Sequence, residues 1–480
     1  MCPLTKPWKL GWTAVMTIVA TAGLLACGGD HLSTRSRRPP RNLLFIIIDA
    51  ASARHFSFAG YYRDTTPRFD EVAREGVLFL STRSQAASTL PSAVSYLSGQ
   101  YPPAPAPLDS EHVRYCYTMD RHSLSEAFGR RGFATAGFSE NPHVTPATAF
   151  DRGFGEFRVY SFFPESLKGE QLRNPDTSET LISDAKKWIR SQGENRWFCY
   201  LHLLRPHNPY QTAEPYASRY SGEPYRLKSH PDSEYALTLA LMRGQEDFSQ
   251  GQVQYLRDLY DGNLAYVDLL VGDLVDEIAK DGQLEDTLLI IASDHGEAFL
   301  EHGRLHHSTT VYEEMIRVPM LIRAPTRMGF MRGTRTHDVE MVDLFPTLIE
   351  IFELETSDRL DGESLVPLLK SPEASHKDRS YSQTHDARVA TVIRGEHKLV
   401  VEVDEDFETL RPTEWFDLGA DPSENVNLLP GRDAPPELVE LAERHLERFL
   451  KPGASGPVIP DEQAAQLKAL GYIEGDRQSE

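Results

Sequence analysis

The stretch from Asn42 to Asp49, Asn-Leu-Leu-Phe-Ile-Ile-Ile-Asp, is a continuous run of apolar side chains that ends in a carboxylate. A short run of this kind is typical of a strand that is buried on both faces, as in a parallel sheet. Between such runs, apolar residues from Leu264 to Ile278 recur at helical spacing, and Gly282 is a plausible stop. The alternation predicts an α/β fold with a mostly parallel sheet. The other strand candidates are residues 133–139, 197–204, 287–292 and 318–322.

Polar residues follow three of the predicted strands. Asp49 ends the first run, His207 follows the run 197–204, and Asp294-His295 follow the run 287–292. Ligand sites in such folds lie beyond the carboxyl ends of the strands. One histidine with carboxylates suits zinc or manganese, whereas calcium prefers more oxygen ligands. An aspartate at a strand end more often forms a turn, so these positions alone leave the metal site open.

The segment Ser88-Thr89-Leu90-Pro91 predicts the start of a helix, because proline suits the first helical turn. Thr89 would then lie at or just before the helix N-terminus. The free N–H groups and the dipole there favour an anion and help a hydroxyl become an alkoxide. A simple Ser/Thr N-cap is the alternative interpretation.

The sequence pattern changes after residue 355, where short β-like runs replace the alternation of apolar strands and helices. Short β-like runs between Tyr381 and Asp417 suggest a small antiparallel sheet, and residues 437–449 predict a helix. Residues 452–460 are rich in Gly and Pro, and residues 467–473 predict a short terminal element. We therefore expect a catalytic domain at 42–355, a C-terminal subdomain at 356–450 and a tail at 451–480.

Several stretches, taken in their order and spacing, resemble the sulfatase family of the alkaline phosphatase superfamily. The resemblance covers nearly everything after residue 42. It implies a three-layer sandwich with a mostly parallel central sheet and a small C-terminal antiparallel sheet. The matching stretches are Asp49 with residues 63–67 and 75–77, Thr89-Leu90-Pro91-Ser92 with residues 98–102, residues 205–210, residues 293–297 with His307, residues 312–314 and 317–319, and weaker matches at 343–347, 361–365, 415–418, 421–422 and 470–472.

Two departures from the sulfatase pattern bear on the chemistry. The nucleophile position of sulfatases holds a Cys or Ser that is oxidised to formylglycine, but here it holds Thr89, and the following Arg position is Ala93. The methyl group of threonine blocks the aldehyde, so formylglycine is not expected. Ala50 stands where sulfatases usually carry a second acidic ligand, which makes calcium less favourable than zinc or manganese.

The remaining pattern is similar to phosphoethanolamine transferases and Thr-using phosphodiesterases of the same superfamily. That resemblance implies one divalent metal on Asp49, Thr89, Asp294 and His295, with room for a second metal. It implies that His207 and His307 contact the transferred group, that either one could protonate the leaving group, and that Asn141 lines the pocket.

We therefore expect a metal-dependent hydrolase that cleaves sulfuric or phosphoric esters of a small molecule, glycan or lipid through a covalent Thr89 intermediate. Thr89 favours phosphoester or phosphodiester chemistry. An envelope phosphoethanolamine-type transferase and a noncatalytic binding protein with a decayed site are the alternatives.

The N-terminus reads as a secretory signal. Lys6 and Lys9 precede an apolar stretch, and Leu24-Leu25-Ala26-Cys27 resembles a bacterial lipobox. We expect a signal peptide at 1–26, lipidation of Cys27, a tether at 27–41 and an exported protein that the lipid alone holds at a cell-envelope membrane. The formal net charge of −21 argues against nucleic-acid binding. Cys116 and Cys199 could pair, although Cys199 lies in an apolar run typical of core.

Overall fold

The computed structural model describes residues 38–105, 119, 121–160, 177–208, 210, 214–221 and 249–449. Cys27, Cys116 and the predicted elements at 452–473 lie outside these ranges, so their assignments stay predictions. Every helix within the described ranges is either too short or too polar to cross a bilayer.

The central sheet has eight strands in the order β10-β2-β9-β6-β1-β5-β3-β4. All neighbouring pairs are parallel except those of β9, which runs antiparallel to both β2 and β6. The sheet is therefore mostly parallel, as the apolar runs predicted. Its strands are β1 (Asn42–Ile48), β2 (Val77–Arg83), β3 (Ala134–Ser139), β4 (Glu156–Val159), β5 (Trp197–Leu203), β6 (Thr287–Ala292), β9 (Arg317–Arg323) and β10 (Gly333–Glu340).

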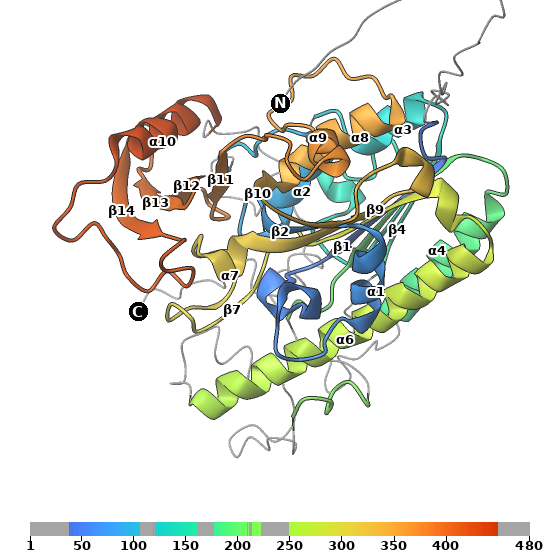
Figure 1. Cartoon of the computed structure of the whole chain (residues 1–480), viewed down its shortest axis with the longest axis horizontal. Coiled ribbons are helices and arrows are strands. Elements are labelled where there is room, and N and C mark those ends of the chain that lie inside the picture. Colours follow the sequence, from blue (N-terminus) through green and yellow to red (C-terminus); the bar gives the residue numbers. More distant parts are fainter. Residues whose placement is uncertain are drawn as a thin grey trace, which may run out of the picture. The chain divides into compact units, whose positions relative to one another are not determined.

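Helices cover both faces of this sheet, giving three layers (Figure 1). On one face lie α1 (Pro67–Glu75), α4 (Thr177–Ser191) and α6 (Gln250–Lys280). On the other lie α2 (Thr89–Ser98), α3 (Leu124–Arg130), α8 (Leu344–Phe352) and α9 (Val366–Lys370). The short helix α7 (Glu313–Ile316) and the hairpin β7 (Ala298–Phe299) and β8 (Leu305–His306) follow β6 along the chain.

Strand β1 is buried along its whole length because its side chains pack alternately into the cores on the two faces of the sheet. Leu44, Ile46 and Ile48 enter the core under α4 and α6, whereas Phe45 and Ile47 enter the core under α2. Each such side chain contributes roughly 1.5–3 kcal/mol by leaving water. This double burial explains why the strand shows no alternation of polar and apolar residues.

Helix α6 is longer than the predicted helix over 264–278. It starts with a capping box formed by Ser249 and Gln252, and it ends at Lys280 just before Gly282. Its first half escaped prediction because the buried face carries charges. Arg63 lies 2.6 Å from Asp258 and 2.7 Å from Asp261, so these carboxylates are paired and buried.

A second, antiparallel sheet follows, as predicted, in the order β11-β12-β13-β14. Helix α10 (Pro436–Phe449) packs against it. A backbone bridge from Ala86 to Gln383 connects its first strand to the loop after β2. The described residues from Pro39 to Phe449 belong to one compact unit, and the boundary near residue 355 stays a prediction. The strands are β11 (Arg379–Gln383), β12 (Val389–Arg394), β13 (His397–Val403) and β14 (Leu410–Asp417).

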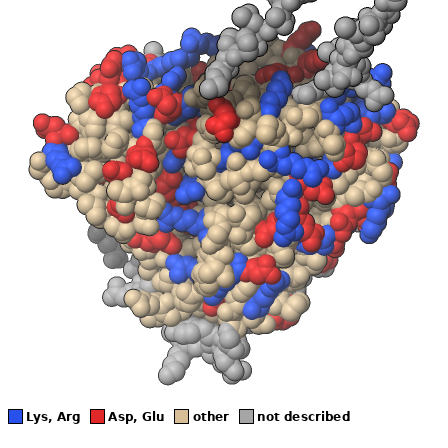
Figure 2. All heavy atoms as spheres, viewed as in Figure 1, with Lys and Arg blue, Asp and Glu red and all other residues tan. Residues whose placement is uncertain are grey.

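Acidic and basic side chains are interspersed on the face shown in Figure 2, despite the net charge of −21. Mixed charge of this kind favours solubility and gives the viewed face no field of a single sign.

Candidate active site

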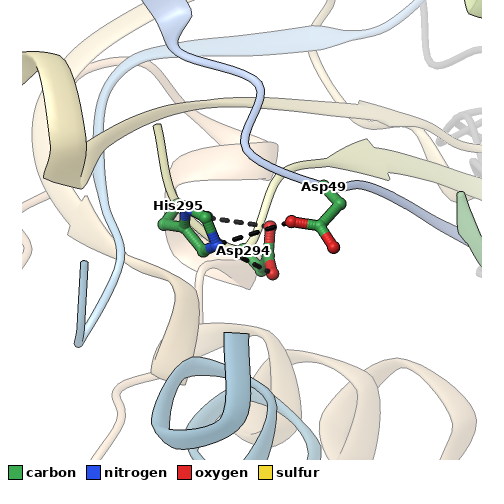
Figure 3. Close-up of side chains that lie close together, drawn as sticks. All are labelled: Asp49, Asp294 and His295. Carbon is green, nitrogen blue, oxygen red and sulfur yellow. Dashed lines mark hydrogen bonds and ion pairs between the residues drawn. The ribbon is translucent and has the colours of Figure 1, made fainter. Parts of the chain in front are cut away.

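Two aspartates and a histidine meet at the carboxyl ends of β1 and β6. Asp49 directly follows β1, and Asp294 and His295 follow β6, all of them fully buried. One ligand atom from each residue lies within 4.8 Å of the other two (Figure 3). The strands pair in register, so the polar residues that follow them are brought together by the sheet itself.

The turn after β1 is shaped to hold this arrangement. Ala50 has a φ of 59°, in the left-handed region, and its N–H donates to Asp294 Oδ1 at 3.2 Å. The Tyr260 hydroxyl donates to the Ala50 carbonyl at 2.7 Å. On the other strand, a Cβ at Gly296 would lie 2.1 Å from the Glu314 carbonyl oxygen, so only glycine fits after His295. The backbone is thus fixed on both sides of the three side chains.

The three side chains fit a divalent metal. His295 Nδ1 lies 2.9 Å from the Gly296 carbonyl, which fixes the tautomer with a proton on Nδ1 and a lone pair on Nε2. Nε2 lies 3.4 Å from Asp49 Oδ1 and 3.6 Å from Asp294 Oδ2, longer than hydrogen bonds. Ligands about 2.1 Å from a tetrahedral ion would be separated by about 3.4 Å.

The two carboxylate oxygens support the same interpretation. Asp49 Oδ1 and Asp294 Oδ2 are buried, and neither accepts a hydrogen bond from any residue that the structure describes. A buried carboxylate oxygen without a partner is costly, and a bound cation removes that cost. Asp49, Asp294 and His295 are therefore the residues of the predicted set that would hold a metal.

The electrostatics of the aspartate pair are asymmetric. Burial alone would raise the pKa of Asp49, but His207, His202 and His295 outweigh it and hold that pKa below its ordinary value. For Asp294, burial and the neighbouring Asp49 charge raise the pKa. Asp49 is therefore the more acidic carboxyl group of the pair.

Thr89 is the first residue of α2 and is fully buried. Its Oγ1 lies 3.3 Å from His295 Nε2, so the hydroxyl borders the metal-binding group. The preceding Ser88 occupies the N-cap position but makes no capping hydrogen bond with its side chain. Because the serine hydroxyl does not cap the helix, the simple N-cap interpretation does not describe this segment, and the helix N-terminus faces the site with its dipole.

Asn141 lies directly between the carboxylate and the hydroxyl. Its Nδ2 donates to Asp49 Oδ2 at 2.5 Å and to Thr89 Oγ1 at 3.3 Å. Its Oδ1 accepts from the backbone N–H of His143 at 2.7 Å, which fixes the orientation of the amide. The side chain predicted to line the pocket thus contacts the nucleophile position itself.

His207 and His307 also reach the site. The two rings are 4.7 Å apart, and the His307 ring lies 4.4 Å from that of His295. Glu297 lies 2.9 Å from His307 Nδ1, so the carboxylate orients this imidazole. Burial and the nearby His295 and His207 lower the pKa of His307. All predicted site residues except Cys27, which the structure does not describe, therefore converge on one place.

Three further histidines surround the site and were not predicted from sequence. His202 of β5 lies 3.5 Å from Asp49 Oδ2, and its Nδ1 lies 2.9 Å from the Tyr200 hydroxyl. In the sequence, His202 could have been recognised as a polar residue near the end of an otherwise apolar strand. His143 follows Asn141 by two residues. His385 comes from the C-terminal sheet, and no local pattern marks it.

Three other residues have structural roles. Ala93, four residues after Thr89 in α2, packs into the core. His302 lies 2.6 Å from Glu314 and stacks on Tyr312 at 3.7 Å, which is a structural role. Cys199 is buried and free, as its apolar surroundings predicted.

Comparison with known proteins gives a consistent family. A family model described as Sulfatase matches residues 41–354, and one described as N-sulphoglucosamine sulphohydrolase, C-terminal, matches residues 301–450. Arylsulfatase K of Gallus gallus is 24% identical over 465 residues, which cover 85% of this chain and 83% of that protein. The multifunctional alkaline phosphatase superfamily protein PehA of Trinickia caryophylli is 24% identical over 445 residues, covering 76% of this chain and 85% of that protein.

Among solved structures, the phosphonate monoester hydrolase of Agrobacterium radiobacter superposes with a TM-score of 0.65 at 21% identity. The match covers 85% of this chain and 95% of that chain. This likeness establishes the three-layer fold with its small C-terminal sheet.

Proposed function

Because this chain belongs to the sulfatase family and is therefore an ester hydrolase, we propose that it cleaves phosphoric esters through a covalent intermediate on Thr89. The observation that carries the proposal is the position of Thr89 Oγ1. It lies at a helix N-terminus, 3.3 Å from His295 Nε2 and 3.3 Å from Asn141 Nδ2. A hydroxyl in that environment is stabilised as an alkoxide.

The reaction would proceed by two in-line displacements. Thr89 Oγ1, after losing its proton to solvent, attacks phosphorus, and the bond from phosphorus to the leaving oxygen breaks. His207 gives a proton to the leaving oxygen, and His307, whose lowered pKa disfavours its protonated form, contacts the transferring group. Water then attacks the phosphothreonine and restores the hydroxyl. Asn141 holds the Thr89 hydroxyl and the Asp49 carboxylate in fixed positions during both steps.

A divalent ion on Asp49, Asp294 and His295 would supply positive charge beside Thr89 and the substrate oxygens. The sulfatase family is metal-dependent, and this donor set fits that requirement. One imidazole nitrogen and two carboxylates favour zinc or manganese over calcium, since Ala50 removes the second acidic ligand usual in sulfatases.

The chemistry of Thr89 favours phosphorus over sulfur. A formylglycine sulfatase releases sulfate when its hemiacetal collapses. A sulfate ester of threonine has no hemiacetal and cannot release sulfate in this way. A phosphothreonine is resolved by ordinary attack of water. Ala93, buried in the core, leaves the family's arginine position without a cation. The name of the similar phosphonate monoester hydrolase is consistent with phosphorus chemistry on this fold.

The test compares 4-nitrophenyl phosphate and bis(4-nitrophenyl) phosphate with 4-nitrophenyl sulfate, using zinc- or manganese-loaded protein. We expect faster turnover of at least one phosphorus ester, loss of all activity in Thr89→Ala and partial phosphate activity in Thr89→Ser. Faster turnover of the sulfate by the wild type would reject the proposed substrate, and activity in Thr89→Ala would reject the nucleophile. A decayed site would turn over none of the three.

We also propose that the enzyme works in the cell envelope, anchored by lipid on Cys27. The proposal rests on the basic, apolar and small-residue pattern that precedes this cysteine. Cys27→Ser should move the protein from the membrane fraction to the soluble fraction, because the variant lacks the proposed lipid anchor. Sedimentation of the variant with membranes after a salt wash would reject the anchor.

A further inference from the structure

The turn between β11 and β12 is a rigid element of the C-terminal sheet. The Thr384 N–H donates to the Val389 carbonyl at 2.8 Å, and the Ala387 N–H donates to the Thr384 carbonyl at 3.0 Å. The Thr384 hydroxyl also donates to Asp386 at 2.6 Å. These bonds close the turn on itself, so the position of its second residue, His385, is fixed by the backbone.

This turn is joined to the loop that carries the nucleophile. The Gln383 N–H donates to the Gln85 carbonyl and the Ala87 N–H donates to the Gln383 carbonyl, each at 3.0 Å. The Ser308 N–H donates to the Ala87 carbonyl at 2.8 Å, and the His385 N–H donates to the Ser308 carbonyl at 3.3 Å. Three segments far apart in sequence thus form one backbone network beside Thr89 and His307.

The His385 side chain contacts the residue that precedes the nucleophile. Its Nδ1 lies 3.1 Å from the hydroxyl of Ser88, the residue before Thr89. This contact explains why the Ser88 hydroxyl does not cap α2. Burial lowers the pKa of His143, and the nearby His385 lowers it further, so the two imidazoles are neighbours. His385 is half-buried, whereas Thr89 is fully buried.

In-line attack decides which part of a substrate such a residue can meet. The leaving group lies opposite Thr89 Oγ1, whereas the three other substituents of phosphorus spread sideways around the nucleophile. Because His385 is within hydrogen-bond distance of Ser88, the residue next to Thr89, we place it beside the nucleophile and not opposite it. A side chain in that position faces an equatorial substituent of the transferring group.

We infer that His385 hydrogen-bonds an equatorial oxygen of the transferring phosphoryl group, so that the C-terminal sheet supplies a specificity-determining residue to the site. This inference rests on the proposed function, because it assumes attack by Thr89 on phosphorus. It predicts that the pocket distinguishes a phosphate, which offers oxygen at this position, from a phosphonate, which can place carbon there.

The kinetic test uses 4-nitrophenyl phosphate and 4-nitrophenyl phenylphosphonate, which share one leaving group. We expect His385→Ala to lower kcat/KM for the phosphate by about 10- to 100-fold and to change that for the phosphonate by less than about threefold. A merely structural role would lower both equally. His397→Ala, an exposed histidine of the same sheet, is the matched control and should change neither.

A double-mutant cycle tests the contact with Ser88. Ser88→Ala, like His385→Ala, should lower the ratio of kcat/KM for the phosphate to kcat/KM for the phosphonate. The reason is that the His385 imidazole loses the hydroxyl that orients it. The combination with His385→Ala should be no worse than His385→Ala alone. Additive losses would mean that Ser88 acts independently of His385.

Binding of inorganic phosphate to the zinc-loaded protein, measured by calorimetry, separates this inference from the proposed function. We expect about tenfold weaker binding in His385→Ala and no change in His397→Ala. Unchanged phosphate affinity together with an unchanged ratio of the two rates would overturn the role of His385. Activity that persists in Thr89→Ala would overturn the proposed function and leave the binding result to decide about His385.

Discussion

Replacing Asn141 with leucine should impair both the nucleophile and the metal-binding group, because one amide nitrogen contacts both. Nδ2 donates to Asp49 Oδ2 at 2.5 Å and to Thr89 Oγ1 at 3.3 Å. A hydrogen bond to a charged group contributes roughly 1.5–3 kcal/mol, and a neutral one roughly 0.5–1.5 kcal/mol. The sum of roughly 2–4.5 kcal/mol corresponds to a loss of about 30- to 2,000-fold in kcat/KM.

The assay measures kcat/KM on the better phosphorus ester together with the metal dissociation constant by chelator competition. We expect about 10- to 100-fold weaker metal binding, since Asp49 loses the group that orients it. Asn263→Leu is the matched control, because Asn263 is equally buried but donates to the Leu259 carbonyl within α6. If Asn141→Leu keeps kcat/KM within threefold of wild type and binds metal equally well, the bridging role assigned to Asn141 is wrong.

Three other changes probe the metal, its selectivity and the C-terminal sheet. Asp294→Ala should remove bound metal and most activity, because it removes one of three ligands; full metal occupancy by elemental analysis would contradict this. Ala50→Asp should bind calcium at least about tenfold more tightly in titration calorimetry, because aspartate tolerates the left-handed backbone and adds an oxygen ligand. Burial lowers the pKa of His445 from 6.5 to about 3, so the stability gained from the neutral imidazole is present above pH 6.5 and is lost as the pH falls. Between pH 7 and pH 5, the free energy of unfolding measured with urea should therefore fall by about 2 kcal/mol less in His445→Phe than in the wild type. Equal decreases in the two proteins would contradict this burial effect.

The sequence predicted those parts of the fold whose physical cause is local. The apolar run 42–48 and its counterparts are buried on both faces, so composition alone marks them as strands. The polar residues that follow them lie at one edge because parallel strands end there. The same reasoning predicts that Asp49, His207 and Asp294-His295 are neighbours.

The remaining parts depend on partners distant in sequence. The edge strand β10 reads Gly-Thr-Arg-Thr-His-Asp-Val-Glu, which carries no apolar run because one side of the strand meets solvent. The first half of α6 buries aspartates that are paired with Arg63, and Asp261 also contacts His55 and Tyr61, all of them distant in sequence. His385 reaches the site through a turn held by Gln85 and Ser308, and nothing within the C-terminal segment records that contact.

The central claim is that Thr89 carries the phosphoryl group, and intact-mass analysis with peptide mapping tests it most directly. The metal-loaded wild type is quenched with acid during turnover of 4-nitrophenyl phosphate, and Thr89→Ala is treated identically. We predict unmodified Thr89 in the resting enzyme, one added phosphoryl group on Thr89 during turnover, and none in the variant. Steady turnover with modification of a different residue, or rapid turnover by Thr89→Ala, would contradict the account.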